Sequence, residues 1–420
     1  MEDNNGSLAL GCQFVRPTLL YTPYSINLYC FAEENKMENF IFRNPTTIVF
    51  GKGSVAKLPE LLSPSKKILM TYGRGSIKRN GVYEQVMEAL KGKKVIEFGG
   101  IQPNPRYETL MEAVQLAKEE KADFLLAVGG GSVLDGTKFI AAAILFEEGD
   151  PWRILSEQAE VKRAIPLGCV LTLPATGSES NGFAVISRES TKEKLAFYSE
   201  HVYPRFSILD PTTTFSLPKR QVANGIVDAF THVMEQYATY PVGAALQDRQ
   251  AEAILTTLIE VGPKTLENPT DYVARANLVW CATQALNGLI GCGVPQDWTT
   301  HMIGHELTAL YGIDHGQSLA VVLPATLRHQ ITKKQKKLAQ YGRRVWGLSS
   351  EDERQLAEQA IDKTEEFFRS LGVKTKLSEY GIPEDAADAV ANRLKKRDVK
   401  LGEHKLITDQ EVREILKLCL

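Results

Sequence analysis

Five side chains in the second half of the sequence have the types and the spacing of ligands to a metal ion. Asp228 and His232 lie four residues apart in a segment with a helical pattern, so both project from one face of a helix. His301 and His305 have the same spacing in a second helical segment, and His315 follows in a loop. One carboxylate with several imidazoles suits iron(II), zinc, nickel or copper. Because a tetrahedral site needs only four ligands, one of these residues is expected to have another role.

The clustering of the histidines is what favours a metal site over a structural role. A lone histidine in a globular protein is most often a structural residue. The chain has only seven histidines, and three of them lie between positions 301 and 315. Together with the pair formed by Asp228 and His232, this concentration predicts a metal site in the second half of the chain.

Two turns in the first half have the composition of phosphate-binding sites. Gly129–Ser132 (GGGS) stands between an apolar run and a helical pattern, where glycines allow close approach of the backbone and a helix N-terminus offers free N–H groups. It matches neither G-x-G-x-x-G nor the P-loop, and its serine is expected to cap the helix. Leu173–Ser180 is a second turn, with hydroxyls at Thr172 and Thr176 for phosphate or ribose. Each is equally consistent with a plain turn, but the two together favour a nucleotide site.

The elements around these turns predict a parallel sheet. Strands are expected at Thr46–Phe50, Lys67–Tyr72, Val95–Phe98, Phe124–Val128, Val170–Leu173 and Ser207–Leu209. Helical patterns alternate with them, which is typical of βαβ units with helices on both faces of the sheet. Ligands bind such sheets at the carboxyl ends of the strands, where both turns fall.

From about Ser216 onward, strand patterns nearly vanish. Helices are expected at Gln221–Tyr237, Leu246–Glu260, Tyr272–Leu286, His301–Tyr311, Gln335–Trp346, Asp352–Leu371 and Ala386–Lys395. The predicted fold is therefore an α/β, Rossmann-like dinucleotide-binding domain at residues 37–215 and an all-α metal-binding domain at residues 216–420, with the site in the cleft between them. Residues 1–36 lack periodicity and are expected to form a disordered extension.

Composition excludes several classes of function. The formal net charge is −2 and 43% of the residues are hydrophobic, which is typical of a globular protein and leaves no basic stripe for nucleic acid. The run Lys333–Lys337 is interpreted as a solvated helix face. No apolar run approaches the roughly 18 residues of a membrane span. The six cysteines form no C-x-x-C pair and are interpreted as reduced thiols of a cytoplasmic protein.

These motifs resemble those of the iron-dependent (group III) alcohol dehydrogenases, in the branch of butanol dehydrogenases and broad-range NADPH-dependent aldehyde reductases. The resemblance covers residues 37–420. Its carriers are Gly129–Ser132 with Asp135 and Lys138, and the segments Leu171–Asn181, Gly225–Glu235 and Asp297–Gln317. It implies a two-domain architecture similar to that of dehydroquinate synthases, a small-molecule substrate and a homodimer.

The resemblance also implies a role for each candidate residue. The ligands of one divalent metal, Fe²⁺ or Zn²⁺, are implied to be Asp228, His232, His301 and His315. His305 matches a catalytic histidine near the nicotinamide that does not bind the metal. The cofactor contacts implied are Asn104 on the adenosine side, Gly130, Gly131 and Ser132 at the pyrophosphate, Asp135 near the nicotinamide, where it counts as catalytic, and Thr172, Thr176 and Lys194.

The chemistry expected is hydride transfer between NAD(P)H and an aldehyde or primary alcohol. The metal acts as a Lewis acid, the cofactor carries the hydride, and either His305 or a relay of ribose hydroxyls passes the proton. Two alternatives stay open. One is a lyase of the dehydroquinate synthase type, which recycles its NAD within one turnover, and the other is a non-catalytic protein that binds a metal or a nucleotide.

The turn after the second predicted strand indicates which cofactor is preferred. No acidic residue occurs at positions 71–80, although a carboxylate commonly binds the ribose 2′-OH of NAD in such sites. Gly73 leaves room, Ser76 offers a hydroxyl, and Arg74 or Lys78 offers positive charge to a 2′-phosphate. We therefore expect NADP(H) to be preferred over NAD(H).

Overall fold

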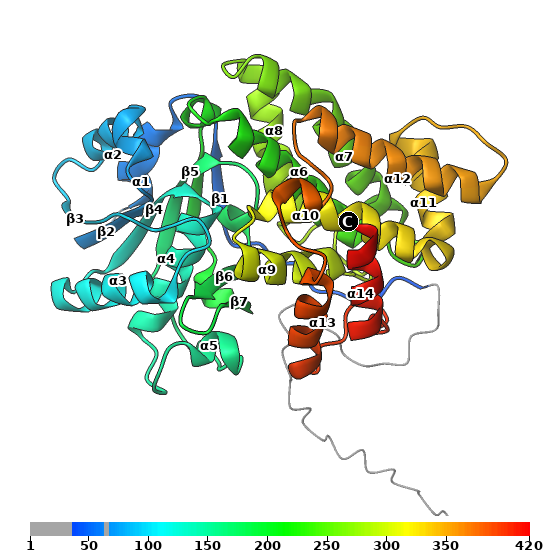
Figure 1. The fold of residues 1–420 in the computed structure, drawn as a ribbon. Helices are drawn as coiled ribbons and strands as arrows, with labels where there is room; N and C mark the ends of the chain where they lie inside the picture. Colours follow the sequence, from blue (N-terminus) through cyan, green and yellow to red (C-terminus); the bar gives the residue numbers. More distant parts are fainter. Residues whose placement is uncertain (1–35, 63–66) are drawn as a thin grey trace, which may run out of the picture.

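The computed structural model describes residues 36–62 and 67–420, and Figure 1 shows two parts of different architecture. The first part contains a six-stranded sheet in the order β1-β8-β5-β4-β2-β3, with each strand parallel to its neighbours. The strands are β1 (Thr47–Phe50), β2 (Lys67–Tyr72), β3 (Lys94–Phe98), β4 (Phe124–Gly130), β5 (Leu167–Leu173) and β8 (Phe206–Leu209). The predicted parallel sheet is confirmed. The expected extension at residues 1–36 lies outside the described residues, apart from Lys36.

Helices cover both faces of this sheet, because alternate residues of its strands point to opposite sides. Ile68 and Met70 of β2 pack in one core with Val86, whereas Leu69 between them packs in another core with Leu110. The helices of this part are α1 (Leu58–Leu61), α2 (Val82–Ala89), α3 (Tyr107–Glu120), α4 (Gly131–Ile144) and α5 (Arg153–Ser156). Strand β4 runs directly into α4, so the carboxyl end of the strand meets the N-terminus of the helix.

A β-hairpin that was not predicted from the sequence follows β5. It consists of β6 (Phe183–Arg188) and β7 (Glu193–Tyr198), which pair antiparallel. Ile186 and Phe197 point from it into the same core as α3 and α4. Each strand is a short apolar run next to two polar residues, and residues 189–192 between them form a polar turn, so this pattern would have identified the hairpin. The hairpin matters for the site because β7 carries Lys194.

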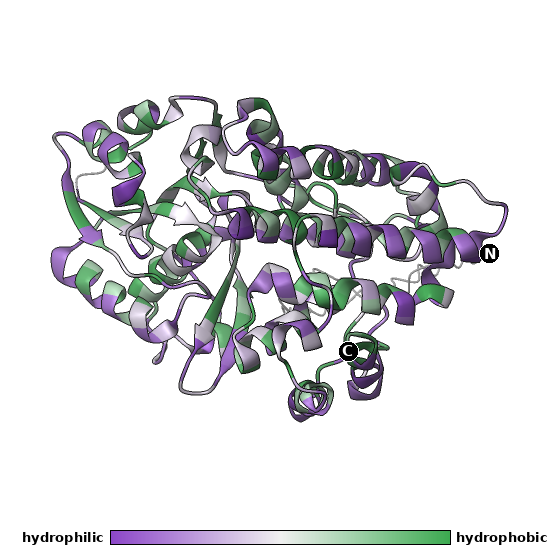
Figure 2. Ribbon diagram, turned by 45° about the horizontal axis from the view of Figure 1, so that its top comes forward, coloured by the Kyte–Doolittle hydropathy of each residue, from purple (hydrophilic) through white to green (hydrophobic). Residues whose placement is uncertain are grey.

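The second part of the chain is helical, as predicted. Its helices are α6 (Lys219–Tyr237), α7 (Ala245–Glu267), α8 (Tyr272–Ala285), α9 (Thr299–Tyr311), α10 (His315–His329), α11 (Ile331–Val345), α12 (Glu353–Ser370), α13 (Ala386–Lys396) and α14 (Asp409–Leu418). One core joins α6, α7, α8, α11 and α12, a second joins α9, α13 and α14, and α10 belongs to both. Figure 2 shows hydrophilic and hydrophobic residues alternating along these helices. None of the described helices is long and apolar enough to cross a membrane.

Two helices of this part, α10 and α14, were not predicted, and neither was the short α5 of the first part. His315, which was expected in a loop, is the first residue of α10. Helix α10 is apolar on nearly every side because it belongs to both cores, so its period of 3.6 residues cannot be read from the sequence. Helix α14 is amphipathic and begins with a capping box at Thr408, a pattern that would have identified it.

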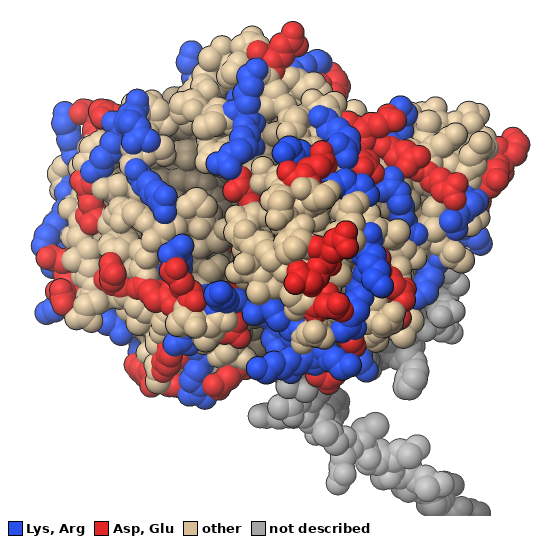
Figure 3. Space-filling view, viewed as in Figure 1, with Lys and Arg blue, Asp and Glu red and all other residues tan. Residues whose placement is uncertain are grey.

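The interpretation of the lysine run as a solvated face is wrong for two of its residues. Lys334 and Lys337 are buried on α11, where they pair with Asp297 and Asp248 respectively. Both partners come from distant parts of the chain, so the pairing is invisible in the local sequence. On the face shown in Figure 3, Lys and Arg are otherwise interspersed with Asp and Glu.

Candidate active site

A cavity of about 790 Å³ is lined by residues from both parts of the chain, and Figure 3 shows the surface hollowed between them. Its walls come from the turns after β2, β4 and β5, the β-hairpin, and the helices α6 and α9. Its volume is ordinary for a small-molecule site. All of the site residues predicted from the sequence except Lys78 line it, namely Gly73, Arg74, Ser76, Asn104, Gly130, Gly131, Ser132, Asp135, Thr172, Thr176, Lys194, Asp228, His232, His301, His305 and His315.

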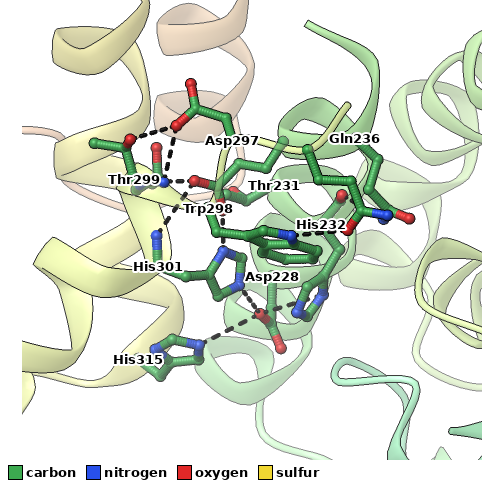
Figure 4. Close-up of polar contacts among 12 residues, drawn as sticks. Asp228, Thr231, His232, Gln236, Asp297, Trp298, Thr299, His301 and His315 are labelled. Atoms are coloured by element: carbon green, nitrogen blue, oxygen red, sulfur yellow. Dashed lines mark hydrogen bonds and ion pairs between the residues drawn. The ribbon is translucent and has the colours of Figure 1, made fainter. Parts of the chain in front are cut away.

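Asp228 stands at the centre of a histidine cluster in the helical wall of this cavity (Figure 4). Its Oδ1 lies 3.6 Å from Nδ1 of His232, 3.6 Å from Nε2 of His301 and 3.6 Å from Nε2 of His315. The ligand atoms of Asp228, His232 and His301 all lie within 4.8 Å of one another. Helix α6 supplies the first two residues one turn apart, α9 supplies His301, and His315 reaches the same oxygen from the start of α10.

The polar atoms of this cluster fit a metal ion. Asp228 Oδ1, His232 Nδ1 and His301 Nε2 are buried without a hydrogen-bond partner in the described chain, and buried polar atoms are normally paired. Burial lowers the pKa of His232 to about 4, although Asp228 opposes the shift, so the ring is neutral and keeps a free lone pair. One carboxylate with neutral imidazoles is a donor set that binds Fe²⁺ or Zn²⁺.

Glu235 is a further part of the cluster that was not singled out from the sequence. Its carboxylate contacts Nδ1 of His301 and accepts a hydrogen bond of 2.5 Å from the backbone N–H of Thr300. Burial lowers the pKa of His301, but the two carboxylates of Glu235 and Asp228 together outweigh burial and raise it to about 9. The ring is therefore protonated before a metal binds, and a metal at Nε2 would displace that proton while Glu235 keeps the one on Nδ1. The spacing was visible, because Glu235 lies three residues after His232 on the same helix.

His305 lies next to the cluster on α9. It is one turn after His301 on α9, and its ring centroid lies 6.3 Å from that of His301 and 5.2 Å from that of His315. Burial, reinforced by the positive charge of Lys194, lowers the pKa of His305 well below its ordinary value. Its predicted role, next to the nicotinamide and off the metal, stays a prediction that this placement supports.

Gly131 allows the two predicted phosphate-binding turns to pack against each other. A Cβ atom at Gly131 would lie 2.5 Å from the side chain of Thr176, so only glycine lets the turns pack this closely. Both border the N-terminus of α4, which suits a pyrophosphate. Ser132 does not cap this helix as expected. The N-cap is Gly130, and the hydroxyl of Ser132 instead accepts a hydrogen bond of 3.3 Å from the backbone N–H of Asn104.

Asp135 and Lys194 add charge to the wall of the cavity. Oδ1 of Asp135 accepts a hydrogen bond of 2.6 Å from Ser178, and its Oδ2 accepts one of 3.0 Å from the backbone N–H of Val185. Burial lowers the pKa of Lys194 to about 8, against the opposing charge of carboxylates, chiefly Asp228. Asp135 thus ties the second turn to the hairpin, while Lys194 places a cation near the histidines.

The turn after β2 presents two arginines to the cavity. Arg74, Ser76 and Arg79 all line it, and neither arginine has an acidic partner in the described part of the chain. Lys78 instead pairs with Glu97 at 2.8 Å, and its Nζ lies over two tyrosine rings. The suggestion that Lys78 offers charge to a 2′-phosphate is therefore wrong, because β3 supplies a carboxylate that holds it elsewhere. Arg79 takes its place beside the cavity.

Models of known protein families match both parts of the chain. The model of iron-containing alcohol dehydrogenases matches residues 45–211, and the model of the C-terminal part of the Fe-containing alcohol dehydrogenase family matches residues 222–420. The chain belongs to the iron-containing alcohol dehydrogenase family. The resemblance stated from the motifs is confirmed, and so is the expected alcohol or aldehyde oxidoreductase. The lyase and the non-catalytic protein are no longer needed as alternatives.

Individual relatives of this alcohol dehydrogenase are similar along nearly their whole length. The NADPH-dependent aldehyde reductase YqhD of Escherichia coli (strain K12) is 57% identical over 375 residues, which are 89% of this chain and 97% of the relative. The probable NADH-dependent butanol dehydrogenase 1 of Bacillus subtilis (strain 168) is 41% identical over 389 residues, which are 91% and 100%. The crystal structure of Escherichia coli K-12 YqhD matches with a TM-score of 0.91 at 55% identity, covering 92% of this chain and 100% of that one. The NADH-dependent butanol dehydrogenase A of Thermotoga maritima matches with a TM-score of 0.88 at 39% identity, with the same coverage.

Proposed function

We propose that this enzyme reduces aldehydes with NADPH at a single divalent ion. The proposed ligands of the ion are Asp228, His232, His301 and His315. The observation that carries the proposal is the set of buried, unpaired ligand atoms around Oδ1 of Asp228, in the same cavity as the glycine turn. Such a set costs stability unless an ion completes it.

The residues of the chain divide the remaining work. When bound, Fe²⁺ or Zn²⁺ polarises the carbonyl oxygen of the aldehyde, and the nicotinamide supplies the hydride. Glu235 holds the imidazole of His301 so that its Nε2 faces the position of the ion. The neutral ring of His305, one turn further along α9, passes a proton between solvent and the alcohol oxygen through its nitrogens. The backbone amides at the start of α4 bind the pyrophosphate.

The preference for NADPH is supported by the turn after β2. Arg74 and Arg79 are cations at the cavity wall without an acidic partner among residues 36–62 and 67–420, and Ser76 adds a hydroxyl beside them. No carboxylate stands in this turn to bind a free ribose 2′-OH. The relative named as NADPH-dependent is 57% identical to this chain, whereas the one named as NADH-dependent in Bacillus subtilis is 41% identical.

We also propose a homodimer in the cytoplasm. The described cysteines, Cys169, Cys281, Cys292 and Cys419, are all free and buried, as in a reducing compartment. Strand β1 is an edge of the sheet, and the ring centroid of its Phe50 lies 6.0 Å from that of Trp280, with both residues more than 40% exposed. A second copy would cover this apolar edge. Sedimentation equilibrium of the wild type and of Phe50→Glu tests it, and a monomeric wild type would contradict it.

The decisive experiment for the metal site compares the wild type with His232→Ala. The wild type should retain one divalent ion per chain by elemental analysis and oxidise NADPH when butanal is added. His232→Ala should lose both the ion and the activity while its circular dichroism spectrum stays unchanged. A metal-free His232→Ala enzyme with full activity would refute the proposed ligand set.

A further inference from the structure

Trp298 has a backbone conformation that bulky residues rarely adopt. Its φ is 62° and its ψ is 9°, in the left-handed region, directly before the first turn of α9. An aromatic residue there is an outlier. Such outliers persist only where the surroundings over-determine them, and they cluster at functional sites.

Buried hydrogen bonds fix the chain on both sides of Trp298. The backbone N–H of Asp297 donates to the carbonyl oxygen of Glu235 at 2.9 Å, and the N–H of Thr300 donates to the carboxylate of the same glutamate at 2.5 Å. The carboxylate of Asp297 pairs with the buried Nζ of Lys334 at 2.6 Å. The conformation of Trp298 is therefore imposed by its neighbours and not by its own side chain.

The indole ring faces the proposed metal ligands. Its centroid lies 5.4 Å from that of His301 and 6.2 Å from that of His232. The planes of the two imidazoles are inclined to the indole plane by 70° and 62°, as in T-shaped ring pairs. Figure 4 shows Trp298 beside these two residues. Its Nε1 donates a hydrogen bond of 2.8 Å to Gln296, which fixes the rotation of the ring. The residue is only 7% exposed, yet it lines the cavity.

We propose that Trp298 determines which aldehydes this enzyme accepts, by limiting the width of the space beside the reacting carbonyl. The inference rests on the proposed metal site, because an aldehyde oxygen at the histidine cluster places the substituent of the carbonyl carbon close to the indole. The cofactor takes the part of the cavity at the strand ends. The substituent is then left with the helical end, which Trp298 borders together with Gln236 and Gln296.

A ring held in this way discriminates by shape. It cannot turn aside without breaking its bond to Gln296, and its backbone cannot follow because Asp297 is tied to Lys334. Slim, unbranched aldehydes pass along its surface, whereas branched or cyclic substituents collide with it. Discrimination of this kind against an added apolar group is typically about 10- to 200-fold.

The test compares propanal with cyclohexanecarbaldehyde in Trp298→Ala and Trp298→Phe, using metal-loaded enzyme and NADPH. The ratio of kcat/KM for the cyclic aldehyde to that for propanal should rise about tenfold or more in Trp298→Ala. Trp298→Phe keeps an aromatic wall and should stay much closer to the wild-type ratio. If Trp298→Ala fails to fold, Trp298→Gly removes the same ring and suits the left-handed backbone.

Three outcomes would overturn the inference. An unchanged ratio in a variant that keeps its ion and still reduces propanal means that the ring is not a wall for the substrate. Loss of the ion, with equal losses for both aldehydes, means that the ring only supports the histidines. A wild type that needs no ion, or reduces neither aldehyde, refutes the proposed function first and the inference with it, and elemental analysis of the wild type distinguishes this case.

Discussion

The carboxylate of Glu235 contacts Nδ1 of His301, and the other ring nitrogen of that histidine lies 3.6 Å from Oδ1 of Asp228. The same carboxylate accepts the backbone N–H of Thr300 at 2.5 Å. One buried group thus sets the tautomer of His301, the plane of its ring and the start of α9. Nε2 faces the position of the ion before any ion arrives, and metal binding displaces its proton while Glu235 keeps the one on Nδ1.

Glu235→Gln should weaken metal binding by about 10- to 100-fold. The glutamine keeps the size of the side chain, but its amide has no negative charge to hold the proton on Nδ1 of His301. Calorimetric titration of the metal-free enzyme with Zn²⁺ measures the change. Glu252→Gln is the control, because Glu252 is also buried in the helical part but lies outside the cavity lining. An unchanged Zn²⁺ affinity in Glu235→Gln would contradict the role assigned to Glu235.

His305→Ala should keep the ion but lower kcat by about 100-fold or more, since the imidazole is the group proposed to pass the proton. KM for the aldehyde should change less than kcat. Elemental analysis and steady-state rates are measured on the same preparation, with His301→Ala as the variant expected to lose the ion. If His305→Ala lost its ion as well, His305 would be a ligand and the assignment would be wrong.

Most of the fold could be predicted because its strands and helices have local sequence patterns that identify them. Each strand of the parallel sheet is a short apolar run with turn residues after it. Helix α10 was missed because it is buried between two cores, and burial on all sides removes the periodicity that marks a surface helix. The boundary proposed between residues 215 and 216 stays a prediction.

The site was predictable where its residues are spaced along one helix. Asp228 and His232 are an example, and Glu235 on the same face of α6 was overlooked only because no role was sought for it. The environments of Lys78 and Trp298 could not be predicted from the sequence. Lys78 is held by Glu97 from another strand, and the left-handed backbone of Trp298 is imposed by bonds from distant segments.

Lys334→Met should lower the free energy of unfolding by about 3 to 5 kcal/mol, because it leaves two buried carboxylates without their cation. Nζ of Lys334 lies 2.6 Å from Asp297 and 3.0 Å from Glu403. Urea unfolding of the variant and of Lys333→Met measures the difference. Lys333 is the neighbouring residue on α11 and is exposed, so its replacement should have little effect. Equal losses in the two variants would mean that the buried pairing adds nothing.

The same pairing should give the protein a defined acid limit. Burial raises the pKa of Asp297, but the ammonium of Lys334, with hydrogen bonds from Thr299 and Glu403, outweighs burial and lowers it to about 2, below the ordinary 3.8. A carboxyl group with a lowered pKa contributes stability that is present above pH 3.8 and is lost as the pH falls toward 2. In Lys334→Met only the hydrogen bonds from Thr299 and Glu403 still oppose burial, so the loss should begin at a higher pH. Thermal unfolding across this pH range compares the two proteins. If the unfolding temperatures of both fell over the same pH interval, Lys334 would not be what lowers the pKa of Asp297.

Gly73 is the position from which cofactor preference can be changed without disturbing the fold. A Cβ atom there would lie 3.5 Å from the carbonyl oxygen of Ile101 and 3.8 Å from Val133, which are ordinary contacts. An aspartate therefore fits, and its carboxylate would stand in the turn that lines the cavity.

Wild-type enzyme should favour NADPH by about tenfold in kcat/KM, which corresponds to about 1.4 kcal/mol of transition-state binding. Gly73→Asp should erode or reverse this preference, because a carboxylate repels the 2′-phosphate and accepts a hydrogen bond from a free 2′-OH. Arg74→Ala and Arg79→Ala should raise KM for NADPH and leave KM for NADH nearly unchanged, since each removes a cation that only the phosphate uses. Lys78→Ala is the matched control, because Lys78 is held by Glu97 and should affect neither cofactor. Steady-state rates with both cofactors decide the question, and a higher kcat/KM with NADH in the wild type would refute the preference.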